Sequence, residues 1–250
     1  MLAPLKPLKW YKELSDKKGR LKGGAFIVEG DKAIRQIMSV RPDEITEIIS
    51  IKEPPAAYRH YSARLVTESQ FRNISSTRTP QGIMAVVRIP ESIYSARLPE
   101  EAGNKILLLE DIQDPGNVGT LIRTAAAFGF SGVIMTENCA DPLAPKCVQS
   151  TAGTVLSVWL RKTAQYLELV RSLRQGGYNL IAAELNGTAE PSVLKQEKLV
   201  LALGNEASGL SKTVMDEADH RLRIPTAREK AESLNVAACG AILMYLSSEK

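Results

Sequence analysis

The hydrophobic pattern of the first hundred residues predicts a small α/β module. Short apolar runs alternate there with segments whose apolar residues recur every three or four positions. Runs of the first kind are typical of strands, whereas the second spacing favours helices. The pattern predicts strands at 25–28, 45–51 and 82–89, and helices at 31–38 and 69–74.

The rest of the chain alternates strands and helices more strongly. The uninterrupted apolar run at 106–109 is expected of a strand that is covered on both faces. Further strands are predicted at 132–135, 155–160, 179–183, 199–203 and 222–224, and helices at 117–128, 164–174 and 234–246. Such alternation predicts the α/β class, with a parallel sheet and helices on both faces.

A polar stretch divides the chain. The sequence IPESIYSARLPEEAGN, at 89–104, contains two prolines, many charges and no clear period, as linkers do. A chain of 250 residues has room for two modest domains. We therefore predict domains at 1–95 and 105–250, joined by a linker at 96–104.

Composition narrows the class of protein. Hydrophobic residues form 44% of the chain and charged residues 24%, which excludes a disordered or coiled-coil protein. No apolar run reaches the roughly 18 residues of a membrane span, and the first residues lack the apolar stretch of a signal peptide. Three dispersed cysteines are too few for a disulfide framework and favour a reducing compartment. We expect a cytoplasmic protein that does not contact a membrane.

The net charge of +4 is unevenly distributed. Residues 1–103 carry 17 basic and 12 acidic groups, a net charge of +5, whereas residues 104–250 carry 15 and 16, a net charge of −1. Seven of the basic groups lie in the first 22 residues. Such a segment either meets phosphates or is a solvated terminus, and the charge pattern favours neither. The candidate phosphate contacts in it are Lys17, Lys18, Arg20 and Lys22.

Several common chemistries have no sequence support. The chain contains neither the G-x-x-x-x-G-K-[ST] phosphate loop nor the G-x-G-x-x-G dinucleotide fingerprint, which disfavours a nucleotide-dependent enzyme. It has only two histidines, His60 and His220, and neither has the spacing to cysteines that zinc sites use. No G-x-S-x-G elbow is present. We expect no metal ion.

Three segments of the second half carry candidate chemistry, and the first is DPGNVGTLIRTAAAFG at 114–129. Its Asp-Pro-Gly start forms a tight turn, and Asn117 can cap the helix that follows. Arg123 is the only charged residue between Asp114 and Glu137, and a charge isolated in this way usually has a dedicated partner. The alternative is a surface arginine on an amphipathic helix.

The second segment is the predicted strand at 199–203 with the turn GNEASGLS that follows it. Open α/β sheets bind ligands where such strands end, and glycines allow close approach of the backbone. The turn holds one carboxylate, Glu206. The alternative is a simple connection to a helix, with Ser211 as the N-cap.

The third segment is the sequence LRIP at 222–225, followed by ESLNVAACGAILMY at 232–245. Ser233 or Asn235 can begin the final helix, and the residues after them are small enough for close packing: Ala237, Ala238, Gly240 and Ala241. The alternative is a C-terminal helix that only docks on the sheet. Docking does not exclude a site at the start of that helix.

Taken in this order, the three segments closely resemble the three motifs of the SpoU/TrmH family of RNA ribose 2′-O-methyltransferases. The matching sequences are DPGNVGTLIRTAAAFG, GNEASGLS and IP…ESLNVA. Upstream, KKGRLKGGAFIVEGDKAI and TPQGIMAVV resemble the small substrate-binding domain, similar to ribosomal L30e, that many members carry. The resemblance implies a parallel-sheet α/β fold whose C-terminal segment forms a deep trefoil knot, a rare exception to the rule against knots. It also implies an L30e-like first domain, S-adenosylmethionine as the cofactor and a homodimer.

The resemblance assigns roles to individual residues. Positions implicated in catalysis or in the architecture of the site are matched by Asn117, Arg123, Glu206, Ser233 and Asn235. Cofactor contacts are matched by Leu203, Gly204, Ile224, Ser233 and Leu234. With RNA as the substrate, the basic segment that contains Lys17, Lys18, Arg20 and Lys22 becomes a candidate RNA contact.

The chain departs from the family pattern in two places. The family's third motif usually has a glycine between proline and serine, whereas the segment here is one residue longer and has none. Ala207 stands where the second motif commonly has glycine. Both changes bear on the wall of the cofactor pocket. The N-terminal module favours ribosomal RNA as the substrate, and the alternatives are transfer RNA and a relative that binds RNA without catalysis.

Overall fold

The computed structural model describes residues 6–227, 229–230 and 233–248 of the chain. The chain forms two compact units, which are described separately below. The first unit comprises Met1–Pro90 with Asp141–Ser157, and the second comprises Glu91–Ala140 with Val158–Lys250. These units differ from the predicted domains chiefly in the segment 141–157, which packs with the first unit.

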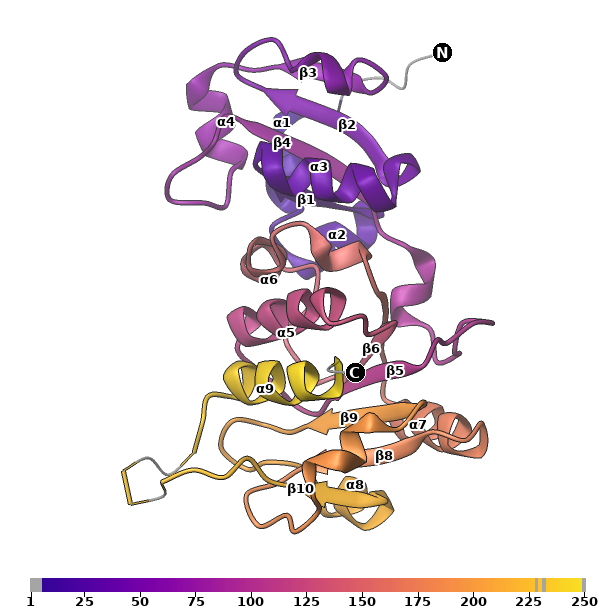
Figure 1. The fold of residues 1–250 in the computed structure, drawn as a ribbon. Coiled ribbons are helices and arrows are strands. Elements are labelled where there is room, and N and C mark those ends of the chain that lie inside the picture. Colours follow the sequence, from indigo (N-terminus) through magenta and orange to yellow (C-terminus); the bar gives the residue numbers. More distant parts are fainter. Residues whose placement is uncertain (1–5, 228, 231–232, 249–250) are drawn as a thin grey trace. The chain divides into compact units, whose positions relative to one another are not determined.

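The first unit contains a mixed four-stranded sheet in the order β1-β4-β2-β3 (Figure 1). Its strands are β1 (Ala25–Glu29), β2 (Ile45–Ser50), β3 (Ser62–Leu65) and β4 (Ile83–Arg88). Strand β4 is antiparallel to β1 and β2, whereas β2 and β3 are parallel. The three predicted strands of this region are confirmed. Strand β3 escaped prediction because its sequence SARL has no apolar run.

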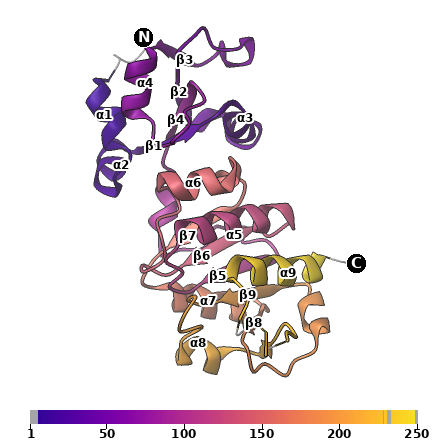
Figure 2. The ribbon, with the colours of Figure 1, turned by 90° about the vertical axis from the view of Figure 1, so that its left-hand side faces the viewer.

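The described part of the first unit contains five α-helices: α1 (Leu8–Glu13), α2 (Lys17–Gly23), α3 (Asp31–Val40), α4 (Glu68–Ile74) and α6 (Pro145–Thr151). Helices α1, α2 and α4 lie on one side of the sheet and α3 lies on the other (Figure 2). Tyr11 and Leu14 from the basic N-terminal segment are buried in a core with Phe71. From Leu8 onward the segment is therefore packed structure rather than a solvated terminus, and the predicted helices at 31–38 and 69–74 are confirmed.

Arg20 is buried in this unit, so its assignment as an RNA contact is wrong. Its side chain is only 3% exposed and donates from Nη2 to Asp141 Oδ2 at 2.5 Å. Nη1 donates to the carbonyl oxygens of Leu14, at 3.1 Å, and Ser15, at 2.7 Å. A buried guanidinium held by three acceptors has a structural role. By contrast, the other three candidates are exposed on α2: Lys17, Lys18 and Lys22.

Replacing Arg20 with alanine is expected to destabilise the first unit by about 3–5 kcal/mol, because it removes the cation from a buried ion pair with Asp141. Urea unfolding measures the loss when it is followed by the fluorescence of Trp10 in α1, with Trp159 replaced by phenylalanine in every protein compared. The matched control is Lys18→Ala on the same helix, where the side chain is exposed and the change stays within about 0.5 kcal/mol. Equal stability of the two variants would contradict the structural role.

The second unit contains a six-stranded sheet in the order β10-β8-β9-β5-β6-β7, and every pairing in it is parallel. Its strands are β5 (Lys105–Leu109), β6 (Gly132–Met135), β7 (Trp159–Lys162), β8 (Asn179–Ala183), β9 (Leu199–Leu203) and β10 (His220–Leu222). The expected α/β class with a parallel sheet is confirmed. Among the described residues, none of the helices has both the length and the apolar character needed to cross a bilayer.

The strand predicted at 155–160 is found at Trp159–Lys162, so its predicted start is wrong. Gly153, at φ +93°, begins a 3-10 turn over Thr154–Leu156, and the chain enters β7 only at Trp159. Val155 and Leu156 are buried in the turn. Their apolar character therefore reflects burial, which a strand, a helix and a turn can all provide.

Helices cover both faces of this sheet (Figure 2). Helices α5 (Pro115–Ala127) and α9 (Val236–Ser248) lie on one face, and α7 (Tyr166–Gln175) and α8 (Lys212–Glu217) lie on the other. Side chains of Ile106 and Leu108 pack with α7 and α8, and the alternate residues of β5 face the opposite layer. A Cβ atom on Gly240 of α9 would lie 2.4 Å from Leu121 of α5, which confirms the predicted close packing at this position.

Candidate active site

The N-cap of helix α5 lies three residues before the position predicted from the sequence. Asp114 is the N-cap, and its Oδ1 accepts a hydrogen bond from the Asn117 backbone N–H at 3.0 Å. Pro115 occupies the first helical position, where it costs no backbone hydrogen bond. The prediction that Asn117 caps the helix is therefore wrong. Its side chain is available for contacts outside the helix.

The turn after β9 is closed by its own hydrogen bonds. The backbone groups of Asn205 and Gly209 exchange two bonds of 3.0 Å. Asn205 Oδ1 accepts from the N–H groups of Ala207, at 2.9 Å, and Ser208, at 3.1 Å. A Cβ atom on Gly204 would lie 2.2–2.4 Å from backbone atoms of Gly209 and Leu210, so this position requires glycine. Gly204 therefore serves the closure of the turn.

A buried carboxylate anchors this turn to the sheet. Glu110, which follows β5, is 4% exposed and accepts bonds from the Ser211 N–H at 2.6 Å and the Ser211 Oγ–H at 2.7 Å. Tyr166 donates its hydroxyl to the same carboxylate at 2.7 Å. Burial and this bond raise the pKa of Tyr166 far above its ordinary value, so its proton stays on the hydroxyl. Ser211 caps α8 through Val214 N–H, as the alternative interpretation of the second motif predicted.

Asp111 provides a second anchor from a strained backbone position. Its φ is +55°, a conformation that is costly for a residue with a side chain. Thr136 donates its hydroxyl to Asp111 Oδ1 at 2.6 Å, and Asn205 Nδ2 donates to the Asp111 carbonyl at 2.7 Å. Sequence analysis missed both Glu110 and Asp111. The signal for them was two carboxylates directly after a buried strand.

A chain of side-chain hydrogen bonds joins the three motifs. Asn117 Nδ2 donates to Glu206 Oε1 at 2.9 Å, and Asn235 Nδ2 donates to Asn117 Oδ1 at 3.1 Å. Asn235 Oδ1 accepts from the N–H groups of Ala237 and Ala238, so Asn235 begins the final helix, one of the two starts that the sequence offered. We call Glu206, Asn117 and Asn235 the polar chain. It brings together residues that are 118 positions apart.

A pocket of about 320 Å³ adjoins the polar chain at the ends of β9 and β10. Its lining includes Glu206 and all five residues that the resemblance assigns to the cofactor: Leu203, Gly204, Ile224, Ser233 and Leu234. Two carboxylates, Glu184 and Glu206, line it, and no lysine, arginine or histidine does so among the described residues. This charge balance suits a ligand that carries positive charge and disfavours a phosphate.

Arg123 and Ser233 stand apart from the polar chain. Arg123 is exposed on α5, and in the described part of the chain it has no hydrogen-bond or ion-pair partner. The dedicated partner that its isolation suggested is therefore not supplied within this part of the chain. Ser233 lines the pocket and is exposed. Three neighbours in the third motif, Arg228, Ala231 and Glu232, lie outside the described residues.

Cys239 of α9 also lines the pocket, and burial raises the pKa of its thiol to about 11. Alkylation by iodoacetamide requires the thiolate, so we expect a slow reaction at pH 8 that accelerates about tenfold per pH unit up to pH 10. A ligand in the pocket is expected to slow it further. Mass spectrometry of the Cys239 peptide, with the Cys239→Ala variant as a blank, measures both effects. A fast reaction at pH 8, at a rate that added S-adenosylmethionine does not change, would contradict the burial of the Cys239 thiol in the pocket.

Comparison with known proteins identifies both parts of the chain. Residues 104–245 match the model of the SpoU rRNA Methylase family, and residues 6–85 match the MRM3-like substrate binding domain. The first match covers more than half of the chain.

Individual relatives agree over nearly the full length. The chain is 32% identical over 245 residues to the Bacillus subtilis 23S rRNA (guanosine(2553)-2′-O)-methyltransferase RlmP, covering 95% of this chain and 94% of that one. A Porphyromonas gingivalis structure described as a TrmH-family RNA methyltransferase is 31% identical, with a TM-score of 0.81 and 98% of each chain covered. An AdoMet-bound rRNA methyltransferase from Sinorhizobium meliloti is 27% identical, with a TM-score of 0.81 and 99% and 96% covered. The chain belongs to the SpoU rRNA methylase family, and it is an S-adenosylmethionine-dependent RNA methyltransferase.

Proposed function

We propose that the protein transfers a methyl group to a ribose 2′-hydroxyl of large-subunit ribosomal RNA. The observation that carries this proposal is the polar chain, in which Asn117, Glu206 and Asn235 join the three motifs beside one pocket. A protein that only binds RNA would not need this arrangement. The relative named for 2′-O-methylation of guanosine 2553 in 23S rRNA supports the substrate.

The pocket suits S-adenosylmethionine by its chemistry. Leu185, Ile224 and Leu234 give it apolar walls, and the carboxylates of Glu184 and Glu206 favour the positive charges of a sulfonium and an ammonium group. The cofactor, when bound, supplies an electrophilic methyl group. Leu203, Gly204, Ile224, Ser233 and Leu234 would hold it.

Within the site, we assign positioning to the polar chain and charge stabilisation to Arg123. A guanidinium is protonated at any physiological pH and is unsuited to act as a base. Arg123 is exposed and has no partner among the described residues, so it can bind an RNA phosphate bidentately and stabilise the developing 2′-alkoxide. The phosphate or a water molecule then accepts the 2′-hydroxyl proton. Glu206 holds the side chain of Asn117, and through it the starts of α5 and α9.

The first unit is assigned to RNA binding. Lys17, Lys18 and Lys22 are exposed on α2, and each phosphate that such a group neutralises releases a counterion. The match of residues 6–85 to a substrate-binding domain supports this role. Replacing the three lysines with alanine is expected to weaken RNA binding and to flatten its salt dependence.

A trefoil knot in the second unit is part of the proposal. The segment after β8 closely approaches β10, where a Cβ atom on Gly187 would lie 2.6–2.7 Å from the backbone of Arg221 and Leu222. The chain that leaves β10 returns as α9 beside α5, and Lys105 Nζ donates to the Ser247 carbonyl at 2.7 Å. The return of the terminal segment to the middle of the sheet, after this close approach, supports the proposal of a knot.

We also propose a homodimer. Helix α9 has exposed apolar side chains, with Ile242 38% and Tyr245 50% accessible, and Leu234 before it is 38% accessible. Exposed apolar groups on one helix and just before it favour burial against a second copy. Sedimentation equilibrium at micromolar concentration tests this, and a monomer would contradict it. A cytoplasmic location fits an RNA substrate and the three free cysteines.

The decisive experiment is methylation of purified, unmodified large-subunit ribosomal RNA with S-adenosylmethionine. A ribose 2′-O-methyl group blocks alkaline cleavage of the adjacent phosphodiester, so partial alkaline hydrolysis maps the modified nucleotide. One protected linkage is expected in ribosomal RNA and none in transfer RNA. Methylation of a base, or of transfer RNA alone, would contradict the proposal. Absence of cofactor binding by calorimetry would favour a non-catalytic RNA-binding protein.

A further inference from the structure

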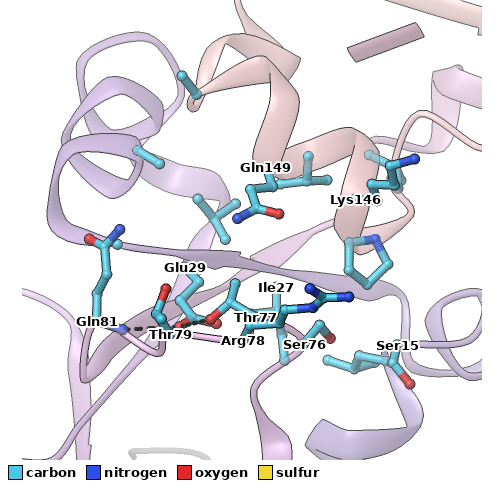
Figure 3. Close-up of a pocket in the computed structure, with 18 of the residues that line it drawn as sticks. Ser15, Ile27, Glu29, Ser76, Thr77, Arg78, Thr79, Gln81, Lys146 and Gln149 are labelled. Atoms are coloured by element: carbon cyan, nitrogen blue, oxygen red, sulfur yellow. Dashed lines mark hydrogen bonds between the residues drawn. The ribbon is translucent and has the colours of Figure 1, made fainter. Parts of the chain in front are cut away.

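A cavity of about 690 Å³ lies within the first unit and shares no residue with the cofactor pocket (Figure 3). Strand β1, the start of α3, the loop after α4 and helix α6 form its walls. In Figure 3 the side chains of Lys146 and Gln149 from α6 lie above those of Thr77 and Arg78 from the loop, and Gln81 of the same loop lies to the left. The cavity is large enough for a nucleotide.

Three cations from three separate elements line this cavity. They are Lys32 of α3, Arg78 of the loop and Lys146 of α6, and each is exposed to solvent. Among the described residues, Glu29 is the only carboxylate in the lining. A concave surface with this excess of positive charge attracts phosphate. Its charge is thus opposite to that of the cofactor pocket, which two carboxylates line.

Glu29 is committed to ordering the loop. Its Oε2 accepts from the Ser75 hydroxyl at 2.7 Å, and its Oε1 accepts from the Thr77 hydroxyl at 2.8 Å and from the Gln81 N–H at 3.2 Å. The carboxylate therefore fixes the loop that carries Arg78 before any ligand arrives. Preorganised walls reduce the entropy cost of binding.

The remaining lining matches a nucleobase. Ile27, Leu143, Pro145 and Val148 provide aliphatic surface, and the Gln81 and Gln149 side chains provide amide donors and acceptors. Amide groups pair with the hydrogen-bonding edge of a base. None of the described residues that line the cavity is aromatic, so aliphatic contacts and hydrogen bonds would hold the base in place of stacking.

We propose that this cavity binds one unpaired nucleotide of the substrate RNA, with its phosphate at Lys32, Arg78 and Lys146 and its base against the aliphatic wall. The inference rests on RNA being the substrate, and it adds a recognition site in the first unit. A duplex cannot enter such a cavity, because its bases are paired and stacked. The site therefore selects an unpaired or extruded nucleotide.

The charge contribution is tested with the Lys32→Ala/Arg78→Ala double variant of the full chain. The probes are unmodified large-subunit ribosomal RNA and a short single-stranded RNA of mixed sequence. Affinity is expected to fall about tenfold or more, and the slope of log affinity against log salt to decrease by about 1.4, or about 0.7 for each lost phosphate contact. The matched control is Arg41→Ala/Lys52→Ala, which removes two exposed cations of the same unit that do not line the cavity. An equal loss in both double variants would overturn the proposal.

The shape of the cavity is tested separately with Gln149→Trp and Gln149→Ala. Tryptophan on α6 obstructs the cavity without changing its charge, so RNA affinity is expected to fall about tenfold while the salt slope stays within about 0.3 of the wild type. Alanine leaves the space open, and we expect a loss below about threefold, from one lost amide contact. Normal RNA binding by the tryptophan variant would overturn the proposal.

Methyl transfer by the same proteins separates this inference from the proposed function. Variants that fill or neutralise the cavity are expected to raise KM for ribosomal RNA and to keep kcat and S-adenosylmethionine affinity. If the wild type methylates ribosomal RNA and the cavity variants bind RNA normally, only the nucleotide site is wrong. If the wild type methylates no ribosomal RNA but the cavity variants still lose RNA affinity, the nucleotide site stands and the proposed function fails.

Discussion

Replacing Arg123 with alanine is expected to lower the single-turnover rate of methyl transfer by about 10²–10³-fold, the usual cost of removing one preorganised charge-stabilising group. The guanidinium is exposed on α5 and makes no hydrogen bond or ion pair with the described residues. Its loss therefore disturbs no internal contact there. Folding and S-adenosylmethionine affinity, measured by thermal melting and calorimetry, are expected to match the wild type within about twofold in affinity.

Two further variants sharpen this result. Arg123→Lys keeps the charge but loses the bidentate geometry, and we expect an intermediate rate. Lys212→Ala removes an exposed cation from α8, on the sheet face opposite α5, and we expect a rate near the wild type. A wild-type rate in Arg123→Ala would eliminate the assignment. A tenfold loss of cofactor affinity in this variant would assign Arg123 to cofactor binding in place of RNA binding.

The second large effect is expected from Gly204→Ala. The added methyl group would lie 2.2–2.4 Å from backbone atoms of Gly209 and Leu210, which cannot move without breaking the paired bonds between Asn205 and Gly209. Glu206 and the pocket wall move with this turn. We expect a loss of at least about 3 kcal/mol in unfolding free energy and more than about tenfold in S-adenosylmethionine affinity.

Gly209→Ala in the same turn is the matched comparison. Gly209 has φ +69°, and nothing lies within 4 Å of its added methyl group, so only the backbone conformation is penalised. That penalty is about 1–2 kcal/mol. Urea unfolding and calorimetry of the two variants distinguish the steric cause from the conformational one. A larger effect at Gly209 than at Gly204 would refute the clash as the reason for glycine.

The sequence was informative where a feature depends on neighbours in the chain. The apolar run at Ile106–Leu109 predicted a central strand, and Ser211 could be predicted as a cap because its partner, Val214, follows three residues later. Signals from neighbouring residues also led to one wrong prediction, the N-cap of α5. Asp114 and Asn117 are both good cap residues, and only the position of Pro115 at the first helical turn decides between them.

Features that depend on contacts between distant segments could not be predicted from the sequence. Arg20 looked like part of a basic patch because Asp141, its buried partner, lies 121 positions further along the chain. Glu110 was not predicted because its partners, Tyr166 and Ser211, come much later in the chain. Charge and hydrophobicity patterns report exposure on average. They do not report which individual charge finds a partner after folding.

The placement of the segment Asp141–Ser157 with the first unit has a consequence for synthesis and for the design of fragments. A nascent chain that has emerged only to residue 95 lacks Asp141 and helix α6, so Arg20 has no carboxylate and one wall of the 690 Å³ cavity is missing. The first unit can finish folding only after strands β5 and β6 of the second unit have been made. On the ribosome the two units must therefore mature together, and a fragment cut at the linker would be an incomplete domain.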